Sequence, residues 1–120
     1  MKINSFLLFF FFTIPFSAVF SQDTVKVSTL VGLDFTAEKL YNSGITKFAS
    51  KDYNGAMTDF NQAIALNENF EKAYYNRGIV RFEMKDVNGA IDDYNHAIKI
   101  NDSCIACYFS RAQAKIFTRK

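Results

Sequence analysis

One short motif in the chain has the residue types for chemistry: Cys104 and Cys107, separated by two residues. A Cys-x-x-Cys pair at a helix start can exchange disulfides, because the N-terminal field of the helix lowers the pKa of the first thiol. In an exported protein the same pair can form a local disulfide. However, the strands that surround redox-active pairs of this kind are missing from the sequence pattern. Tyr108 also stands where haem attachment requires His.

We predict neither a metal site nor a catalytic site. One Cys-x-x-Cys is half of a zinc site, and the sequence supplies no second half. The single His, His96, falls on a helix face that we expect to be solvated. No Gly-rich phosphate loop or nucleophile elbow is present. We therefore expect no enzyme activity and no cofactor, with a thiol-active exported protein that uses Cys104 and Cys107 as the alternative.

The N-terminus has the layout of a secretory signal peptide over residues 1–21. Lys2 is followed by an apolar run over 6–20, and small residues precede a cleavage site before Gln22. The run is shorter than the about 20 residues of a membrane span. We expect a periplasmic or secreted protein with no stable membrane span after cleavage. An uncleaved anchor is the alternative.

The charge of the chain gives no reason to expect binding to nucleic acid. The formal net charge is +2 over 120 residues, and removal of Lys2 with the leader leaves +1. No run of Lys or Arg forms a basic patch, so we expect no nucleic-acid partner.

The rest of the chain is organised by a 34-residue repeat. DYNGAMTDFNQAI at 52–64 is followed by DVNGAIDDYNHAI at 86–98. The same register divides the chain into units at 37–70 and 71–104 and a partial unit at 105–120, after a linker at 22–36. Apolar residues recur at steps of three or four within each unit, which predicts two helices per unit.

Turn and cap residues agree with this division. Asp52 and Asp86 precede the second helix of each unit, where an Asp can accept hydrogen bonds from the first turn. Asn67 and Asn101 are expected to end these helices in the left-handed conformation. The Asn-Gly pair at 54–55 also suits a β-hairpin, but its flanks lack the alternation of strands.

These units resemble the tetratricopeptide repeat (TPR) family over residues 37–120. The consensus residues of that family fall on Leu40, Gly44, Ala56, Phe60 and Ala63, then on Tyr74, Gly78, Ala90, Tyr94 and Ala97, and continue at Tyr108 and Ala112. Lys51 and Lys85 replace the Gly that is common in the turn. Lys47 and Arg81 stand at a position that is usually aromatic. The resemblance implies an all-α helical solenoid of about two and a half repeats.

The resemblance also implies a non-catalytic module that binds a protein or peptide on a concave surface lined by the first helices. The implied partner-binding residues are Tyr41, Ile45, Phe48, Tyr75, Ile79, Phe82, Phe109, Gln113 and Ile116. Some TPR proteins clamp the C-terminal carboxylate of acidic peptides with Lys, Arg and Asn. Here only Asn76 fits, because Tyr41, Ile45 and Ala106 replace the others, so we do not predict that ligand.

Two further expectations concern the contacts of the units. Asp59 and Asp93 share one repeat position, and Arg77 and Arg111 share another, which predicts inter-unit pairs of Asp59 with Arg77 and of Asp93 with Arg111. The apolar side chains of 105–120 indicate a contact with a partner or a second copy. Alternatively, the chain is a truncated piece of a longer TPR assembly protein.

Overall fold

Five α-helices make up the part of the chain that the computed structural model describes, residues 36–120. They are α2 (Ala37–Ala49), α3 (Tyr53–Leu66), α4 (Glu71–Glu83), α5 (Val87–Ile100) and α6 (Ile105–Thr118). The predicted all-α fold is confirmed, and residues 36–120 contain no strand. The predicted leader, and all of the predicted linker except Thr36, lie outside the described residues. Within residues 36–120, no helix combines the length and the apolar character needed to cross a membrane.

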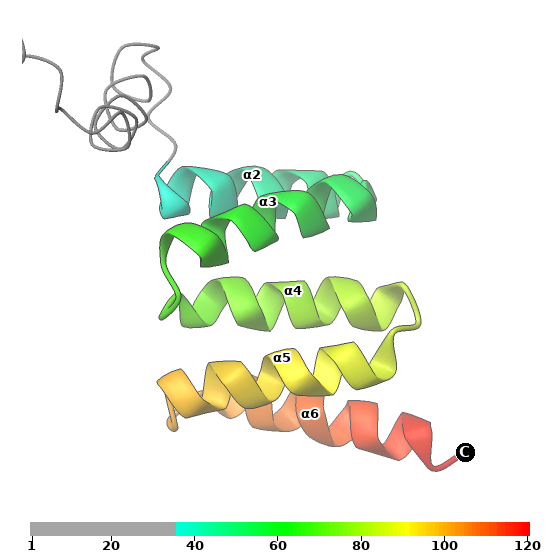
Figure 1. The fold of residues 1–120 in the computed structure, drawn as a ribbon. Coiled ribbons are helices and arrows are strands. Elements are labelled where there is room, and N and C mark those ends of the chain that lie inside the picture. Colours follow the sequence, from blue (N-terminus) through cyan, green and yellow to red (C-terminus); the bar gives the residue numbers. More distant parts are fainter. Residues whose placement is uncertain (1–35) are drawn as a thin grey trace, which may run out of the picture. The chain divides into compact units, whose positions relative to one another are not determined.

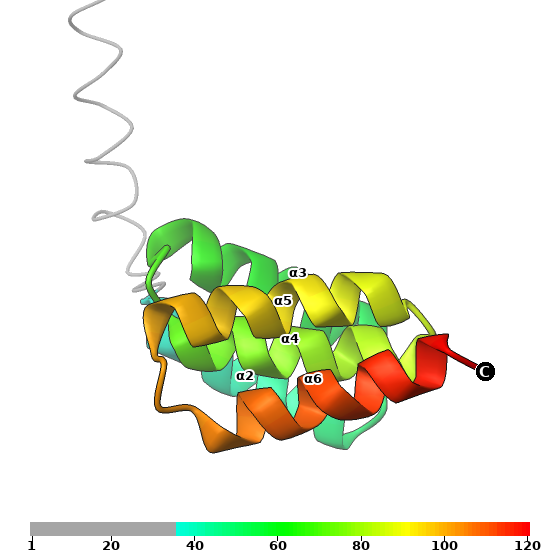
Figure 2. The same ribbon diagram turned by 90° about the horizontal axis from the view of Figure 1, so that it is seen from below.

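The helices stack in chain order, with α2 and α3 at one end and α5 and α6 at the other (Figure 1). We call α2, α4 and α6 the first helices and α3 and α5 the second helices. A view turned by 90° places the second helices toward one side of the stack and α2 and α6 toward the other (Figure 2). Direct contacts of α4 with both α2 and α6 place the three first helices next to one another.

Acidic caps begin the second helices, as the sequence predicts. The carboxylate of Asp52 accepts a hydrogen bond from the backbone N–H of Gly55 at 3.0 Å. Asp86 accepts one from Gly89, also at 3.0 Å. These bonds satisfy N–H groups that have no partner within the helix. Asn54 and Gly55 lie in the first turn of α3, which excludes the hairpin.

The prediction of left-handed Asn residues at the ends of the second helices is wrong. Asn67 and Asn101 are extended, with φ values of −142° and −133°. The side chain of Asn67 accepts a hydrogen bond from the backbone of Asn69 instead. The left-handed residues are Lys51 and Lys85, with φ of 63° and 69°, in the turns where the family commonly has Gly. The tight turn inside each unit, not the looser one between units, requires this conformation.

The core runs between first and second helices and depends on close approach at two glycines. A Cβ atom at Gly44 would lie 2.6 Å from Phe60, and one at Gly78 would lie 2.6 Å from Tyr94. Both aromatic side chains are almost fully buried. Gly at these positions thus lets a ring of the second helix pack directly on the backbone of the first helix.

Candidate functional site

Each complete helix pair buries one carboxylate between its two helices. Asp93 on α5 is 1% exposed and accepts hydrogen bonds from Arg77 at 2.6 and 3.0 Å. Arg81 lies on the same side of α4, and its Nη1 atom is 3.0 Å from the second oxygen of Asp93. A carboxylate is tolerated in a position buried from solvent only when it is paired with a cation and hydrogen-bonded. The two guanidinium groups meet this requirement.

The first pair builds the same feature from different residues. Asp59 on α3 accepts a hydrogen bond from the hydroxyl of Ser43 at 2.6 Å. The ammonium group of Lys47 lies 2.8 Å from the same oxygen. Lys47 and Arg81 therefore act as counter-ions of a buried carboxylate, which explains why neither position carries the usual aromatic residue.

The predicted inter-unit ion pairs are wrong. Arg77 pairs with Asp93 of its own unit, because α4 and α5 pack antiparallel and bring these two positions together. The link to the preceding unit is a hydrogen bond from Arg77 Nη1 to the amide oxygen of Asn61 at 2.8 Å. Arg111 makes the equivalent bond to Asn95, also at 2.8 Å. Arg77 and Arg111 thus do join successive units, but each bonds to an Asn of the preceding unit and not to the Asp that lies two residues before that Asn.

The nine residues predicted to bind a partner lie on the first helices, and we call them the first-helix row. Six are partly buried and pack against core clusters: Tyr41, Ile45, Phe48, Tyr75, Ile79 and Phe82. The other three, Phe109, Gln113 and Ile116 on α6, are exposed. The row is therefore both an outer edge of the core and a surface, and its role in binding remains a prediction.

Polar and aromatic contacts connect successive first helices along the row. The amide of Asn76 donates a hydrogen bond to the hydroxyl of Tyr41 at 3.1 Å. Tyr75 and Ser110 share a hydrogen bond of 3.5 Å. Burial raises the pKa of Tyr41, and the bond from Asn76 acts in the opposite direction. The hydroxyl of Tyr41 is thus a neutral acceptor that fixes α2 against α4.

The positions that would clamp a carboxylate do not form an anion site. Asn76 has its amide engaged by Tyr41 and by the backbone oxygen of Lys72. Tyr41 and Ile45 supply a phenol and an alkyl group where a clamp needs cations and amides. Ala106 is exposed on α6 and has no polar atom in its side chain. A C-terminal carboxylate would find no pair of charged donors here.

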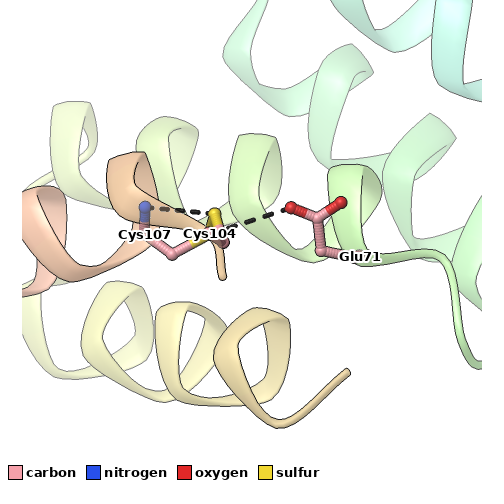
Figure 3. Close-up of side chains that lie close together, drawn as sticks. All are labelled: Glu71, Cys104 and Cys107. Atoms are coloured by element: carbon pink, nitrogen blue, oxygen red, sulfur yellow. Dashed lines mark hydrogen bonds between the residues drawn. A yellow bond between two sulfur atoms is a disulfide. The ribbon is translucent and has the colours of Figure 1, made fainter. Parts of the chain in front are cut away.

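Cys104 and Cys107 are joined by a disulfide at the start of α6, beside Glu71 of α4 (Figure 3). Cys107 is fully buried, and its sulfur lies 4.0 Å from the Glu71 carboxylate. Cys104 also caps α6, because its sulfur accepts a hydrogen bond from the backbone of Cys107 at 3.2 Å. Glu71, Cys104 and Cys107 could together offer ligands to a metal ion only after reduction, since a thiolate is the ligand form.

An additional cleft lies between the repeats, away from the first-helix row. Its volume is about 750 Å³, and it is lined by residues that include Ile64, Glu68, Tyr74, His96 and Lys99. His96 is exposed, as predicted, but its ring stacks on Tyr74 at 5.2 Å. Sequence reasoning missed this cleft, because Tyr74 belongs to the first helix of its unit and His96 to the second.

Two family models match the chain. Residues 44–85 match a model described as TPR repeat, and residues 71–104 match one described as tetratricopeptide repeat. Together these matches extend over residues 44–104, about half of the chain. No curated protein matches the chain.

Solved structures with similar folds agree with these matches. A crystal structure of MamA is 31% identical with a TM-score of 0.69, covering 69% of this chain and 48% of that chain. The first TPR of Spaghetti (RPAP3), bound to the HSP90 peptide SRMEEVD, is 20% identical with a TM-score of 0.72 and 87% coverage of each chain. The TPR2B domain of yeast Sti1, in a complex with pHsp70, is 24% identical with a TM-score of 0.67, covering 68% and 66%. The chain thus spans about half the length of the MamA chain that it matches.

Proposed function

The chain belongs to the tetratricopeptide repeat family, and we propose that its first-helix row binds a segment of a partner protein. TPR folds generally serve as non-catalytic scaffolds for protein interaction. The observation that carries the proposal is the continuity of the row, since Asn76 joins α4 to α2 and Ser110 joins α6 to α4. Similar folds that are solved with bound HSP90 and HSP70 peptides support a peptide ligand.

The side chains of the row favour an apolar segment over an acidic C-terminus. Ile45, Ile79 and Ile116 provide alkyl groups, and the aromatic residues add flat surfaces that lose little conformational entropy on binding. No cation of the row stands where a terminal carboxylate would lie. We infer that the preferred ligand inserts aliphatic or aromatic side chains between the first helices.

A phage-displayed peptide library, panned against the full chain, tests this proposal. We expect selected peptides to be rich in Leu, Ile and aromatic residues. Their binding should fall in Ile79→Gln and in Gln113→Arg, which alters an exposed position of the row. Leu66→Gln, a change of an exposed residue at the end of α3, is the matched control. The heptapeptide SRMEEVD should bind no better than a scrambled version.

Circular dichroism must show native helix content in each variant before binding is compared. Selected peptides that bind all variants equally would refute the row as the site. Tight binding of SRMEEVD that depends on its terminal carboxylate would refute the apolar ligand.

We also propose that the protein is exported and works in the periplasm or outside the cell. The layout of residues 1–21 is the main support. The disulfide at Cys104 adds to it, because such bonds persist mainly in oxidising compartments. N-terminal sequencing of protein recovered outside the cytoplasm should begin at Gln22. A full-length chain that stays in the cytoplasm would contradict export.

A further inference from the structure

Helix α6 repeats the residues by which α4 holds its second helix. In α4 the set is Tyr74, Arg77, Gly78 and Arg81, and in α6 the counterparts at a spacing of 34 are Tyr108, Arg111, Ala112 and Lys115. We call these four residues the α6 outer face. Gly78 is buried against Tyr94 of α5, whereas Ala112 is exposed. Within residues 36–120, no helix covers α6 in the way that α5 covers α4.

The side chain of Arg111 already has the pose of its counterpart. Arg77 donates a hydrogen bond to Asn61 at 2.8 Å and lies 5.4 Å above the ring of Tyr74. Arg111 donates to Asn95 at 2.8 Å and lies 5.2 Å above the ring of Tyr108. Arg77 contacts an Asn, a Tyr ring and the carboxylate of Asp93, and Arg111 makes the first two of these three contacts.

The third contact is the one that α6 lacks. Arg77 and Arg81 share the carboxylate of Asp93, but none of the ion pairs within residues 36–120 includes Arg111 or Lys115. Arg111 is held in place by Asn95 and Tyr108, and Lys115 follows it by one helical turn. Arg111 is therefore a preorganised cation, and Lys115 adds a second positive charge one turn away, without a carboxylate between them.

Apolar residues border the two cations. Phe109 and Ile116 are 63% and 59% exposed, although their counterparts Tyr75 and Phe82 are partly buried. Tyr75 contacts Tyr94, the residue that follows the buried Asp93. A helix placed on α6 as α5 is placed on α4 would thus cover apolar surface and set a carboxylate between the cations.

We propose that the α6 outer face docks an amphipathic helix of a partner protein, with one carboxylate inside its apolar face directly before a large apolar residue. Charge complementarity with Arg111 and Lys115 specifies the carboxylate. A second copy of the same face is disfavoured, because it would oppose four cations with no anion. This site adjoins the first-helix row and shares Phe109 and Ile116 with it, but its cations Arg111 and Lys115 lie outside the row, and it does not rest on the proposed function.

A peptide that copies α5 provides the probe, because α5 carries the required pattern in Asp93 and Tyr94. Fluorescence anisotropy would measure binding of labelled DVNGAIDDYNHAIKIN (86–101) to the full chain. We expect saturable binding that weakens about tenfold when the peptide carries Asp93→Asn. An Asp92→Asn peptide should bind like the parent, since Asp92 is exposed on α5.

Matched protein variants locate the site. Arg111→Gln should weaken binding by about the same factor as the peptide change, and the two changes together should add little. Lys115→Gln is the second variant, because Lys115 is exposed and its loss should not disturb folding. Lys99→Gln, an exposed cation on α5, should leave binding unchanged.

Three results would overturn the proposal. The first is no binding at millimolar peptide. The second is binding that ignores both Arg111→Gln and Lys115→Gln, which would mean that the peptide displaces α5 from α4. The third is a stable dimer by light scattering that Arg111→Gln dissociates, which would assign the face to a second copy.

Discussion

The two complete helix pairs bury a carboxylate at the same repeat position and hold it in different ways. Asp93 is 1% exposed, and Arg77 and Arg81 contact both of its oxygens. Asp59 receives Ser43 and Lys47 at a single oxygen, and the Lys47 side chain is 39% exposed. The first pair therefore neutralises its buried carboxylate with a single cation, Lys47, whose side chain is partly exposed to solvent.

This difference separates what the repeat requires from what it tolerates. The repeat requires an acceptor at this position of the second helix and a donor sixteen residues earlier, which is Ser43 or Arg77. The kind of cation varies, since Lys47 and Arg81 occupy one position. A planar guanidinium matches a carboxylate with two bonds, whereas an ammonium acts as a point charge. The second pair should thus depend more strongly on its carboxylate.

The largest effect is expected from Asp93→Asn. This change leaves Arg77 without a counter-ion and Arg81 with only the more distant carboxylate of Asp86 at 3.8 Å, which should lower the free energy of unfolding by about 3–5 kcal/mol. Asp59→Asn should lower it by only about 1–2 kcal/mol, because Lys47 can turn to solvent. Urea denaturation followed by circular dichroism measures both. Asp92→Asn is the exposed control, and equal losses for Asp59 and Asp93 would contradict the comparison.

The second effect is a pH dependence that arises from Tyr94 in the second pair, at a position where the first pair has a residue that does not titrate. Tyr94 occupies the position of Phe60, and burial raises its pKa from 10.0 to about 12. Since the folded state holds this proton more tightly, its stabilising contribution is present below pH 10 and is lost as pH rises toward 12. The loss should reach about 2 kcal/mol near pH 11.5.

Denaturation midpoints at pH 9 and pH 11.5 would measure that loss in the native chain and in Tyr94→Phe. Deprotonation of lysines is common to both proteins, so the difference isolates Tyr94. An identical pH response in the variant would refute this role, and ultraviolet titration of the phenols would confirm the raised pKa directly.

Much of the fold could be predicted because the repeat carries redundant information. Three kinds of structural residue recur at a spacing of 34: the small Ala56 and Ala90, the caps Asp52 and Asp86, and the glycines Gly44 and Gly78. An element assigned in one unit is therefore supported by the same residues in the other. The helix ends at Asn67 and Asn101 were located correctly for the wrong conformational reason. Instead of a left-handed backbone, each Asn side chain accepts a hydrogen bond from the backbone N–H two residues later, in the turn between the units.

The site was less predictable, because it depends on which side chains face each other across helices. Sequence spacing put Asp59 and Asp93 at one repeat position and Arg77 and Arg111 at another, but it could not reveal that Ser43 and Lys47 already satisfy the carboxylate of Asp59. The row residues could be placed on the first helices from the repeat register, but the partial burial of six of them depends on the packing. The open face of α6 became visible only by comparing its contacts with those of α4.

A third effect concerns the close approach at Gly78. A methyl group there would lie 2.6 Å from the ring of Tyr94 and 3.2 Å from Cβ of Asp93. We expect Gly78→Ala to lower the free energy of unfolding by about 1–2 kcal/mol, after the helix preference of Ala offsets part of the clash. Gly44→Ala should cost less, because the three atoms nearest to the added methyl group all belong to the ring of Phe60, whereas Gly78 also faces the Cβ atom of Asp93. Thermal denaturation ranks the two, and stabilisation by either change would contradict the packing.

The smallest effect concerns the turns, where Lys51 and Lys85 have φ values of 63° and 69°. Left-handed backbone is unfavourable for Lys and free of strain for Gly, so Lys51→Gly should stabilise the chain by about 0.5–1 kcal/mol. Lys85→Gly should gain less, because the ammonium group of Lys85 lies 5.9 Å from the ring centroid of Phe117 and the change removes that contact. In a Phe117→Leu background the two gains should become equal. If Lys85→Gly still stabilised the chain less than Lys51→Gly in that background, the contact between Lys85 and Phe117 could not be the cause of the difference.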